Sequence, residues 1–500
     1  MRIIYFLLVL ITSVSITSCS HKHDHENDHS HDEILSLTTY NEYFEVFVEA
    51  DPFVTGEESS LIAHITKLDN FKPLDSAEVT ATLTVGSNKI EHIAPSATSE
   101  GEFHFNLTPN TIGKGDLSFN ISTNEGASVA TIDDITIYDN EHTAHEEAHD
   151  AIPEVVNGIA FTKGQSWKVG FATEVVRRQE FGQVIKTTAQ IQPSSGDERI
   201  ITAMTDGVVI FQDNQTVPGR AVSSGQRLFY IDASEMADNN LSVKTLEAES
   251  EYDRAKIEYE RKEKLAKDNI ISQSELLQAK TELANAQANV DNLNRNFTSG
   301  KQAVSSPLSG FVTDVLVQNG EFVSAGQPVL RVSQNKNLFI KAELQPKYFN
   351  TLSNISTANI TIPAINQSYS LEELNGKVLS YGQSSNMNNP LIPVMFQVSN
   401  SAGLLPGSFV DMYIKIKSNN QEISIPNTAI VEEMGAYFVM VQITPELFEK
   451  RAIVKGPTDG FSTLIVDGVS ENERIVSKGA IFVKLAQAAG ALDPHAGHAH

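Results

Sequence analysis

The run Asp206-Gly207-Val208-Val209 opens a short segment that closes with Val222-Ser223-Ser224-Gly225-Gln226-Arg227-Leu228. The same pattern returns from Ser309-Gly310-Phe311-Val312 to Val323-Ser324-Ala325-Gly326-Gln327-Pro328-Val329-Leu330. In each segment a G-x-V opening is followed by V-x-x-G-Q, with a leucine three residues after the glycine in the first segment and four residues after it in the second. Apolar residues bounded by glycine turns are typical of short strands, so these segments predict two matching β half-motifs.

The residues between the half-motifs have helical periodicity with one break in the middle. Apolar or small residues recur there at the 3-4 spacing of a coiled-coil seam. They are Ala248, Tyr252, Ala255, Tyr259 and Ala266, then Leu276, Ala279, Leu283, Ala286, Val290, Leu293 and Phe297. Two seams joined by a short break predict an antiparallel α-helical coiled-coil hairpin over residues 239–300.

The N-terminus predicts export and a lipid anchor. Met1-Arg2 and the apolar run Ile3 to Ile11 are typical of a signal peptide, here residues 1–18. The sequence Ile16-Thr17-Ser18-Cys19 resembles a bacterial lipobox, and Cys19 is the single cysteine. We therefore expect a lipid on Cys19, with a plain signal peptide and an incidental cysteine as the alternative. The net charge of −26 disfavours nucleic acid and anionic lipid surfaces as partners.

The 500 residues are too many for one hydrophobic core. Residues 19–34 are polar and His-rich, and we expect them to form a tether. Alternating segments in residues 35–140 predict an N-terminal β-sandwich, and a second acidic, His-rich linker follows at 141–154. We expect a β-barrel at 335–416 and a membrane-proximal β domain from residues 155–198 and 417–485. The chain ends with a His-rich tail at 486–500.

The half-motifs resemble the two halves of a biotinyl or lipoyl carrier domain, which assigns residues 199–238 and 301–334 to one flattened barrel. The carrier enzymes present a modifiable lysine in a tight turn between the halves. Here the hairpin replaces that turn, without Met-Lys-Met or Asp-Lys-Ala at its apex. We therefore expect no covalent cofactor other than the lipid.

The order of segments from about residue 155 to 485 resembles the periplasmic adaptor, or membrane fusion, subunits of resistance-nodulation-division (RND) efflux pumps. Leu405-Pro406-Gly407 in the expected barrel and Ile425-Pro426-Asn427-Thr428-Ala429-Ile430 after it add to the likeness. The resemblance implies a multidomain, mainly β fold with an inserted helical hairpin. It also implies an inner-membrane transporter and an outer-membrane channel as partners, with self-association into a ring that is often hexameric.

Within that family the hairpin tip contacts the channel through an arginine, a leucine and a serine at fixed spacing. Arg261, Leu265 and Ser272 have that spacing here. Each residue also has a structural interpretation. Ser272 and Glu275 form a capping-box pattern, Leu265 could end the seam, and Arg261 could lie on a solvated helix face.

Eleven of the 14 histidines lie in three polar segments. They are His21, His23, His25, His29 and His31; His142, His145 and His149; and His495, His498 and His500. Imidazole is a good ligand for zinc, nickel, cobalt and copper(II), whereas copper(I) or silver favours sulfur. The segments resemble the His-rich tails of heavy-metal adaptors, and a solvated tether without metal binding is the alternative. His64, His92 and His104 are expected to be ordinary surface or core residues.

These observations predict a non-enzymatic adaptor in the periplasm, anchored more plausibly to the inner membrane, for export of zinc, cobalt, nickel, cadmium or copper cations. The alternatives are an adaptor for drugs or other organic compounds and a stand-alone periplasmic metal-binding lipoprotein. An enzyme is disfavoured because no nucleophile-elbow, zinc-protease or phosphate-loop spacing occurs.

Overall fold

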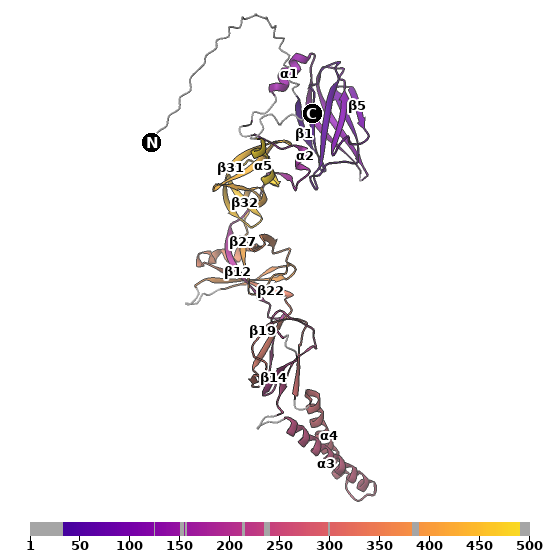
Figure 1. Cartoon of the computed structure of the whole chain (residues 1–500), viewed down its shortest axis with the longest axis vertical. Coiled ribbons are helices and arrows are strands. Elements are labelled where there is room, and N and C mark those ends of the chain that lie inside the picture. Colours follow the sequence, from indigo (N-terminus) through magenta and orange to yellow (C-terminus); the bar gives the residue numbers. More distant parts are fainter. Residues whose placement is uncertain are drawn as a thin grey trace, which may run out of the picture. The chain divides into compact units, whose positions relative to one another are not determined.

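The computed structural model describes residues 34–124, 126–150, 155, 158–212, 216–234, 241–298, 301–382 and 390–490. These residues form a mainly β protein with one long helical hairpin, which confirms the predicted fold class (Figure 1). The chain divides into two compact units. One comprises Met1–Ala172, Gln442–Glu449 and Phe482–His500, and the other comprises Thr173–Val441 and Lys450–Ile481.

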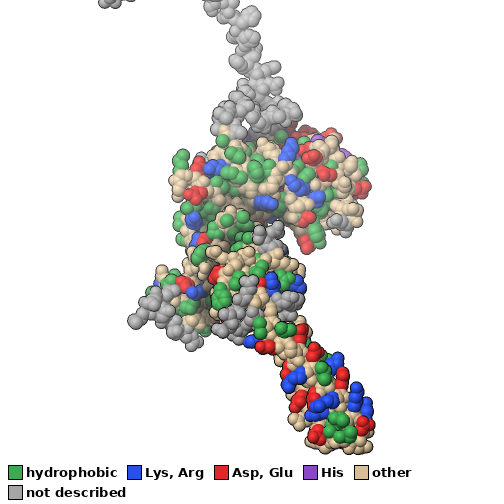
Figure 2. All heavy atoms as spheres, turned by 60° about the horizontal axis from the view of Figure 1, so that its bottom comes forward, with side chains coloured by type: hydrophobic (Ala, Val, Ile, Leu, Met, Phe, Trp, Pro, Cys, Tyr) green, Lys and Arg blue, Asp and Glu red, His purple; other side chains and the backbone are tan. Residues whose placement is uncertain are grey.

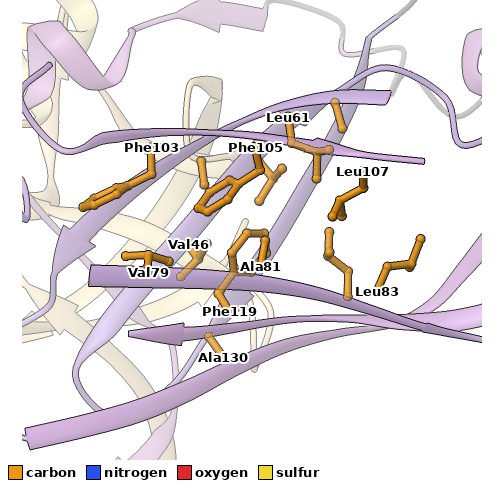
Figure 3. Packing of buried hydrophobic residues seen from close by; sticks show 14 of the residues in the cluster. Val46, Leu61, Val79, Ala81, Leu83, Phe103, Phe105, Leu107, Phe119 and Ala130 are labelled. Atoms are coloured by element: carbon orange, nitrogen blue, oxygen red, sulfur yellow. The ribbon is translucent and has the colours of Figure 1, made fainter. Parts of the chain in front are cut away.

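The first unit contains a β-sandwich of two four-stranded antiparallel sheets, ordered β1-β2-β3-β6 and β5-β4-β7-β8. Inward and outward residues alternate along the strands, as in β6, where Phe103 and Phe105 are buried and His104 is exposed. The rings of Phe105 and Phe119 pack edge to face across the core with centroids 5.7 Å apart (Figure 3). The strands are β1 (Leu35–Tyr40), β2 (Phe44–Ala50), β3 (Ser59–Lys67), β4 (Glu78–Val85), β5 (Asn88–Ala94), β6 (Glu102–Leu107), β7 (Gly113–Thr123) and β8 (Gly126–Ile137).

A buried ion pair joins the sandwich to the segment that follows it. Lys163 in the short helix α2 (Lys163–Ser166) pairs with Glu45 of β2, and their side chains are only 3% and 2% exposed. The hydroxyl of Tyr40 also donates to Glu45, at 2.9 Å. Nearby, the indole N–H of Trp167 donates to the Thr66 hydroxyl at 3.1 Å. These contacts fix the outer face of one sandwich sheet against residues 163–167.

His64 lies at the same junction. Its Nε2 is 3.2 Å from a carboxylate oxygen of Glu49, and its Nδ1 is 3.8 Å from one of Glu102. Burial raises the pKa of nearby Glu446, whose carboxylate accepts the backbone N–H of Lys163. His64 is thus a buried residue that faces several acidic groups.

Lys163→Met should lower the free energy of unfolding by about 3–5 kcal/mol, because it leaves the buried Glu45 charge without its cationic partner. Denaturant unfolding, with hydrogen exchange of the β2 amides as a local readout, measures the loss. The double variant Glu45→Leu/Lys163→Met is the control, and it should recover most of the stability. Equal losses in the single and double variants would contradict this account of the pair.

In the second unit, the two glycine half-motifs interleave into two small sheets. Their orders are β13-β21-β19-β15 and β17-β18-β16-β14-β20, so each sheet takes strands from both halves. Gly207 and Gly310 occupy equivalent places, since a Cβ would lie 2.6 Å from the Asp232 carbonyl oxygen and 2.2 Å from that of Ser333. Only glycine permits these close approaches. The strands are β13 (Glu198–Thr202), β14 (Gly207–Phe211), β15 (Ala221–Val222), β16 (Arg227–Asp232), β17 (Phe297–Thr298), β18 (Lys301–Ser305), β19 (Gly310–Val315), β20 (Phe322–Val323) and β21 (Pro328–Ser333).

A seven-stranded sheet follows, ordered β24-β23-β27-β12-β22-β26-β25. Its strand β12 (Val184–Pro193) lies within residues 155–198, which we assigned wholly to the membrane-proximal domain. That part of the assignment is wrong, because β12 pairs with β22 and β27 and buries Ile185, Ala189 and Ile191 in the core of this sheet. The other elements are β22 (Asn337–Leu344), η1 (Pro346–Asn354), β23 (Ile355–Ile362), β24 (Gln367–Ser370), β25 (Lys377–Tyr381), β26 (Ile392–Ser399) and β27 (Phe409–Ile416).

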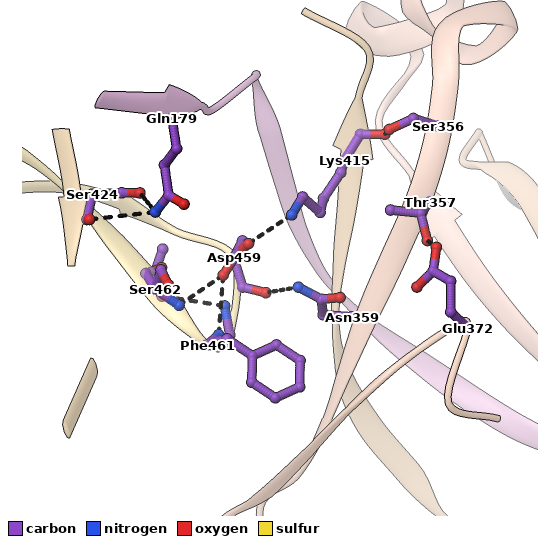
Figure 4. A network of polar contacts seen from close by, with 12 residues as sticks. Gln179, Ser356, Thr357, Asn359, Glu372, Lys415, Ser424, Asp459, Phe461 and Ser462 are labelled. Atoms are coloured by element: carbon purple, nitrogen blue, oxygen red, sulfur yellow. Dashed lines mark hydrogen bonds and ion pairs between the residues drawn. The ribbon is translucent and has the colours of Figure 1, made fainter. Parts of the chain in front are cut away.

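Asp459 fastens the turn between β31 (Leu447–Thr458) and β32 (Ser462–Asp467) to this seven-stranded sheet (Figure 4). The Asp459 carboxylate pairs with Lys415 Nζ at 2.8 Å, and its backbone carbonyl accepts the Asn359 amide at 2.7 Å. The same carboxylate accepts the backbone N–H groups of Phe461 and Ser462. One buried aspartate therefore shapes the turn and ties it to β23 and β27.

The next strands and helices lie in residues 158–180 and 421–490. Strand β9 pairs with the Leu447–Glu449 end of β31, and β28 pairs with both β11 and β32. Their bounds are β9 (Gly158–Ala160), β10 (Ala172–Val175), β11 (Arg178–Glu180), β28 (Gln421–Pro426), η2 (Asn427–Ala429), β29 (Val431–Glu433), β30 (Ala436–Thr444), β31 (Leu447–Thr458), β32 (Ser462–Asp467), β33 (Arg474–Lys478) and α5 (Ala480–Gly490).

Candidate functional site

The helical hairpin consists of α3 (Leu241–Lys267) and α4 (Gln273–Asn296). Small seam residues let the two helices approach closely, and five predicted seam alanines are at most 9% exposed: Ala248, Ala255, Ala266, Ala279 and Ala286. Lysine, arginine, aspartate and glutamate side chains are mixed over the outside of the hairpin (Figure 2). The predicted hairpin is therefore held by a narrow apolar seam inside a charged surface.

Helix α3 ends in a Schellman motif. Asn269 has a left-handed backbone conformation with φ of 58°. The N–H of Ile270 donates to the Leu265 carbonyl at 2.9 Å, and the N–H of Asn269 donates to the Ala266 carbonyl at 3.1 Å. These two bonds satisfy carbonyl groups that the helix leaves free, and asparagine tolerates the left-handed position better than most residues.

Helix α4 begins with the capping box that its sequence predicts. The backbone N–H of Ser272 donates to Glu275 Oε2 at 2.8 Å, and the backbone N–H of Glu275 donates to the Ser272 hydroxyl oxygen at 3.2 Å. Hydrogen bonds from the Ser272 backbone and hydroxyl lower the pKa of the Glu275 carboxyl. The connection between the helices is thus shaped from both ends, with only a short exposed segment between the caps.

All three predicted channel-docking residues lie at this end of the hairpin. Ser272 is the N-cap of α4, and half-buried Leu265 is in the last turn of α3. Arg261 is exposed one turn earlier and pairs with Glu258 at 2.7 Å, which lowers the pKa of the Glu258 carboxyl. Their contact with a channel stays a prediction. The structure places all three at the end of the hairpin that such a contact requires.

Two exposed apolar residues at the tip escaped the sequence analysis. Ile270 is 66% exposed and Leu277 is 64% exposed. A hydrophobic patch near the end of the hairpin is visible in Figure 2. The sequence signal was present in Asn269-Ile270, because an asparagine followed by an apolar residue after a seam is typical of the Schellman motif.

The second histidine tract, within the predicted linker at 141–154, forms a helix. Helix α1 (Glu141–Asp150) places His142, His145 and His149 at i, i+3 and i+7, on one face. Ala144 and Ala148 lie one turn apart on an adjoining face and are at most 3% exposed, and the burial of these alanines favours the helix. Among the residues that the structure describes, no three histidine, cysteine or acidic side chains stand close enough to hold a metal ion.

The other predicted sites, namely Cys19 and the histidines before residue 34 and after residue 490, lie outside the described residues. No described helix is long and apolar enough to cross a membrane. His92 has an ordinary structural role, because its Nδ1 accepts the backbone N–H of Asn106 at 2.6 Å.

Residues 237–298 match the family model described as the α-helical hairpin domain of RND membrane fusion proteins. The hairpin belongs to this family of domains. Members of this family are periplasmic adaptors of RND efflux pumps and act as structural linkers rather than enzymes.

Individual relatives of this chain carry two kinds of name. The nickel-cobalt-cadmium resistance protein NccB of Alcaligenes xylosoxydans xylosoxydans is 24% identical over 322 residues, covering 63% of this chain and 78% of NccB. The multidrug resistance protein MdtA of Proteus mirabilis (strain HI4320) is 23% identical over 237 residues, covering 45% of this chain and 57% of MdtA. Among solved structures, ZneB from Cupriavidus metallidurans is 21% identical with a TM-score of 0.32, over 65% of this chain and 97% of ZneB.

Ser272→Ala should destabilise the first turn of α4 by about 1 kcal/mol, because it removes the N-cap acceptor. Faster hydrogen exchange of the Glu275 and Leu276 amides would report the loss. Ser274→Ala, at an exposed position in the same turn, is the matched control and should change exchange little. Unchanged protection in Ser272→Ala would show that the cap contributes nothing.

The cap should also weaken in acid. The lowered pKa of Glu275 means that its stabilising contribution is complete at neutral pH, above the ordinary carboxyl value, and is lost as the pH falls through the lowered value. Exchange of the same amides as a function of pH measures this. In Glu275→Gln the increase in amide exchange at acid pH should be absent. If the increase persisted, Glu275 would not be the group responsible for it.

Proposed function

We propose that this protein links an inner-membrane RND transporter to an outer-membrane channel, as one of several copies in a ring, for the export of heavy-metal cations. The observation that carries the adaptor role is the hairpin, with two capped helices meeting at a short tip where Arg261, Leu265 and Ser272 gather. At about 1.5 Å per residue, α3 reaches roughly 40 Å. Such a hairpin suits contact at a distance from the β domains.

The channel contact can be tested at Arg261. Arg261→Ala should reduce copurification of the outer-membrane channel with the adaptor and lower resistance, because an exposed donor at the tip is lost. Arg254→Ala is a matched control, since Arg254 pairs with Glu251 in the same i, i+3 arrangement but lies farther from the tip. Equal effects of the two substitutions would argue against a docking role for Arg261.

Ser272 needs a substitution that separates capping from docking. Asparagine is as good an N-cap as serine, so Ser272→Asn should preserve the protection of α4 amides. If the hydroxyl contacts the channel, this variant should still lose copurification. Normal copurification with Ser272→Asn would limit Ser272 to its capping role.

Metal cations are the proposed cargo, and the His-rich tracts support this choice. In α1, His145 and His149 are separated by one turn, and His142 lies on the same face. Rotation of the imidazoles on such a face can bring two rings to one ion, with water or an acidic neighbour completing its shell. The names of NccB and MdtA favour metals and drugs respectively, so drug export is the second candidate.

Zinc or nickel titration of the purified protein tests the α1 tract. His145→Ala/His149→Ala should remove one class of bound metal and the accompanying gain in helicity or amide protection at residues 141–150. His104→Ala, an exposed histidine outside the tracts, is the control. Identical titration curves for both variants would remove α1 from the proposal.

We further propose that Cys19 carries the lipid and that the N-terminal and C-terminal tracts add metal-binding capacity at the membrane surface. Cys19 follows an apolar signal-like run, and both tracts are rich in imidazole. A stand-alone metal-binding lipoprotein is disfavoured by the hairpin, since capturing metal does not require a long capped coiled coil.

A further inference from the structure

The sheet of β1, β2, β3 and β6 has one face in the sandwich core and the other against residues 163–167 and the turn that contains Glu446. His64 of β3 lies on this second face, and its side chain is only 10% exposed. The rings of Phe47 and Trp167 have centroids 5.7 and 6.2 Å from that of the imidazole. All of these residues belong to the first compact unit. A titratable ring is therefore buried where the sandwich meets the segments that pack on it.

Carboxylates approach this imidazole from three elements. Glu49 Oε2 on β2 is 3.2 Å from Nε2, and Glu102 Oε1 on β6 is 3.8 Å from Nδ1. The second oxygen of Glu102 accepts the Ser99 hydroxyl, which fixes the position of this carboxylate. Glu446, between β30 and β31, interacts electrostatically with both His64 and Glu49. Each nitrogen atom of the ring thus faces a carboxylate.

The lysine side chains at this junction are engaged elsewhere. Lys163 pairs with Glu45, and Lys72 donates to backbone carbonyl groups that follow α2. Exposed His104 comes two residues after Glu102, on the same side of β6. Within the described part of the chain, neither carboxylate in contact with the ring has an ion pair with lysine or arginine. A charge on the imidazole is therefore their cationic partner at this place.

A neutral imidazole leaves one of these contacts unfavourable. It has a single N–H, so only one of its two nitrogen atoms can donate. When Nε2 of His64 donates to Glu49, the lone pair of Nδ1 faces the Glu102 carboxylate. Among the described residues, this buried Nδ1 has no hydrogen-bond partner. Protonation supplies a second donor and places a positive charge between the two carboxylates, which both favour the charged ring.

The same charge acts across the junction. Burial is the main cause that raises the pKa of Glu446, the Glu49 carboxylate raises it further, and His64 lowers it. The folded state then holds a proton that the unfolded state has released, so stability falls as the pH rises from the ordinary carboxyl range through the raised value. Without a proton on His64, ionised Glu446 and Glu49 repel each other across the junction.

We propose that His64 is a proton-dependent link between the β-sandwich and the segments packed on it, residues 163–167 and the turn at Glu446. Protonated His64 joins Glu49 and Glu102 and offsets the repulsion between the sheet and Glu446. Loss of this proton loosens the junction as the pH rises through about 5–8, where histidine changes its charge. This inference goes beyond the proposed function, because it concerns the N-terminal sandwich and involves neither the hairpin nor the cargo.

Trp167, the single tryptophan, reports on this junction because it is 4% exposed and lies beside His64. The experiment measures quenching of its fluorescence by acrylamide in the full-length protein, with a chelator present to exclude metal ions. The quenching constant should rise about twofold or more between about pH 5 and pH 8, because a looser junction admits the quencher. A constant value over this range would overturn the proposal.

Two variants attribute the change to the imidazole. His64→Gln keeps a donor for Glu49 but cannot gain a charge, so quenching should stay near its alkaline level and most of the rise should vanish. His104→Gln, on the neighbouring strand, is the matched control and should behave as the wild type. A rise in His64→Gln as large as in the wild type, or its loss in His104→Gln, would overturn the assignment.

Two further variants at the carboxylates do not depend on how well His64→Gln folds. Glu102→Gln should move the midpoint of the rise to lower pH, because a neutral amide stabilises the charged imidazole less than a carboxylate does. Glu446→Gln should reduce the rise without moving its midpoint, because it removes the repulsion but not the titrating ring. An unchanged midpoint in Glu102→Gln would show that His64 is not the titrating group.

Discussion

The pairing of β16 with β18 is the constraint on which the hairpin depends. These strands flank the helices in sequence, and their antiparallel pairing places Asp232 opposite Lys301, with their charged groups 3.1 Å apart. Strand β17, directly after α4, pairs with β18 as well. The two ends of a long insertion are therefore held at one place in a small β structure. Strand pairing at the base of the hairpin offsets the entropy that is lost when the long insertion is closed. The helices therefore need only a narrow seam to stay together.

The tip is fixed by a different set of forces. Neither the alanine-rich seam nor the exposed charged surface would define the path of residues 268–272. Backbone hydrogen bonds at Asn269 and Ile270 end α3, and the reciprocal bonds of Ser272 and Glu275 begin α4. Because these caps determine where Leu265 and Ser272 lie, the local chemistry that ends the helices also determines what the hairpin presents to a partner. The proposed channel contact would couple stability to recognition at this end, which is why capping and docking need separate substitutions.

The hairpin and the half-motifs were predictable because their signals are local. Seam spacing, glycine turns and the Ser272-Glu275 pattern all lie within a few residues. The place of β12 was not predictable in the same way, since its partner β27 is far along the chain and only pairing reveals which sheet buries Ile185 and Ile191. In α1, the abundance of histidine and acid concealed the Ala144 and Ala148 face. The Lys163 and Glu45 pair arises from tertiary packing, for which neither residue gives a sequence signal.

The central claim concerns the cargo. The fold alone does not distinguish metals from drugs, because one adaptor architecture serves both. The most direct measurement is survival of a strain lacking this gene across zinc, cobalt, nickel, cadmium, copper and a panel of drugs, with the gene restored as control. The account predicts sensitivity to one or more of the metals and unchanged growth on the drugs. Sensitivity to drugs alone would contradict the metal assignment and leave a drug-efflux adaptor.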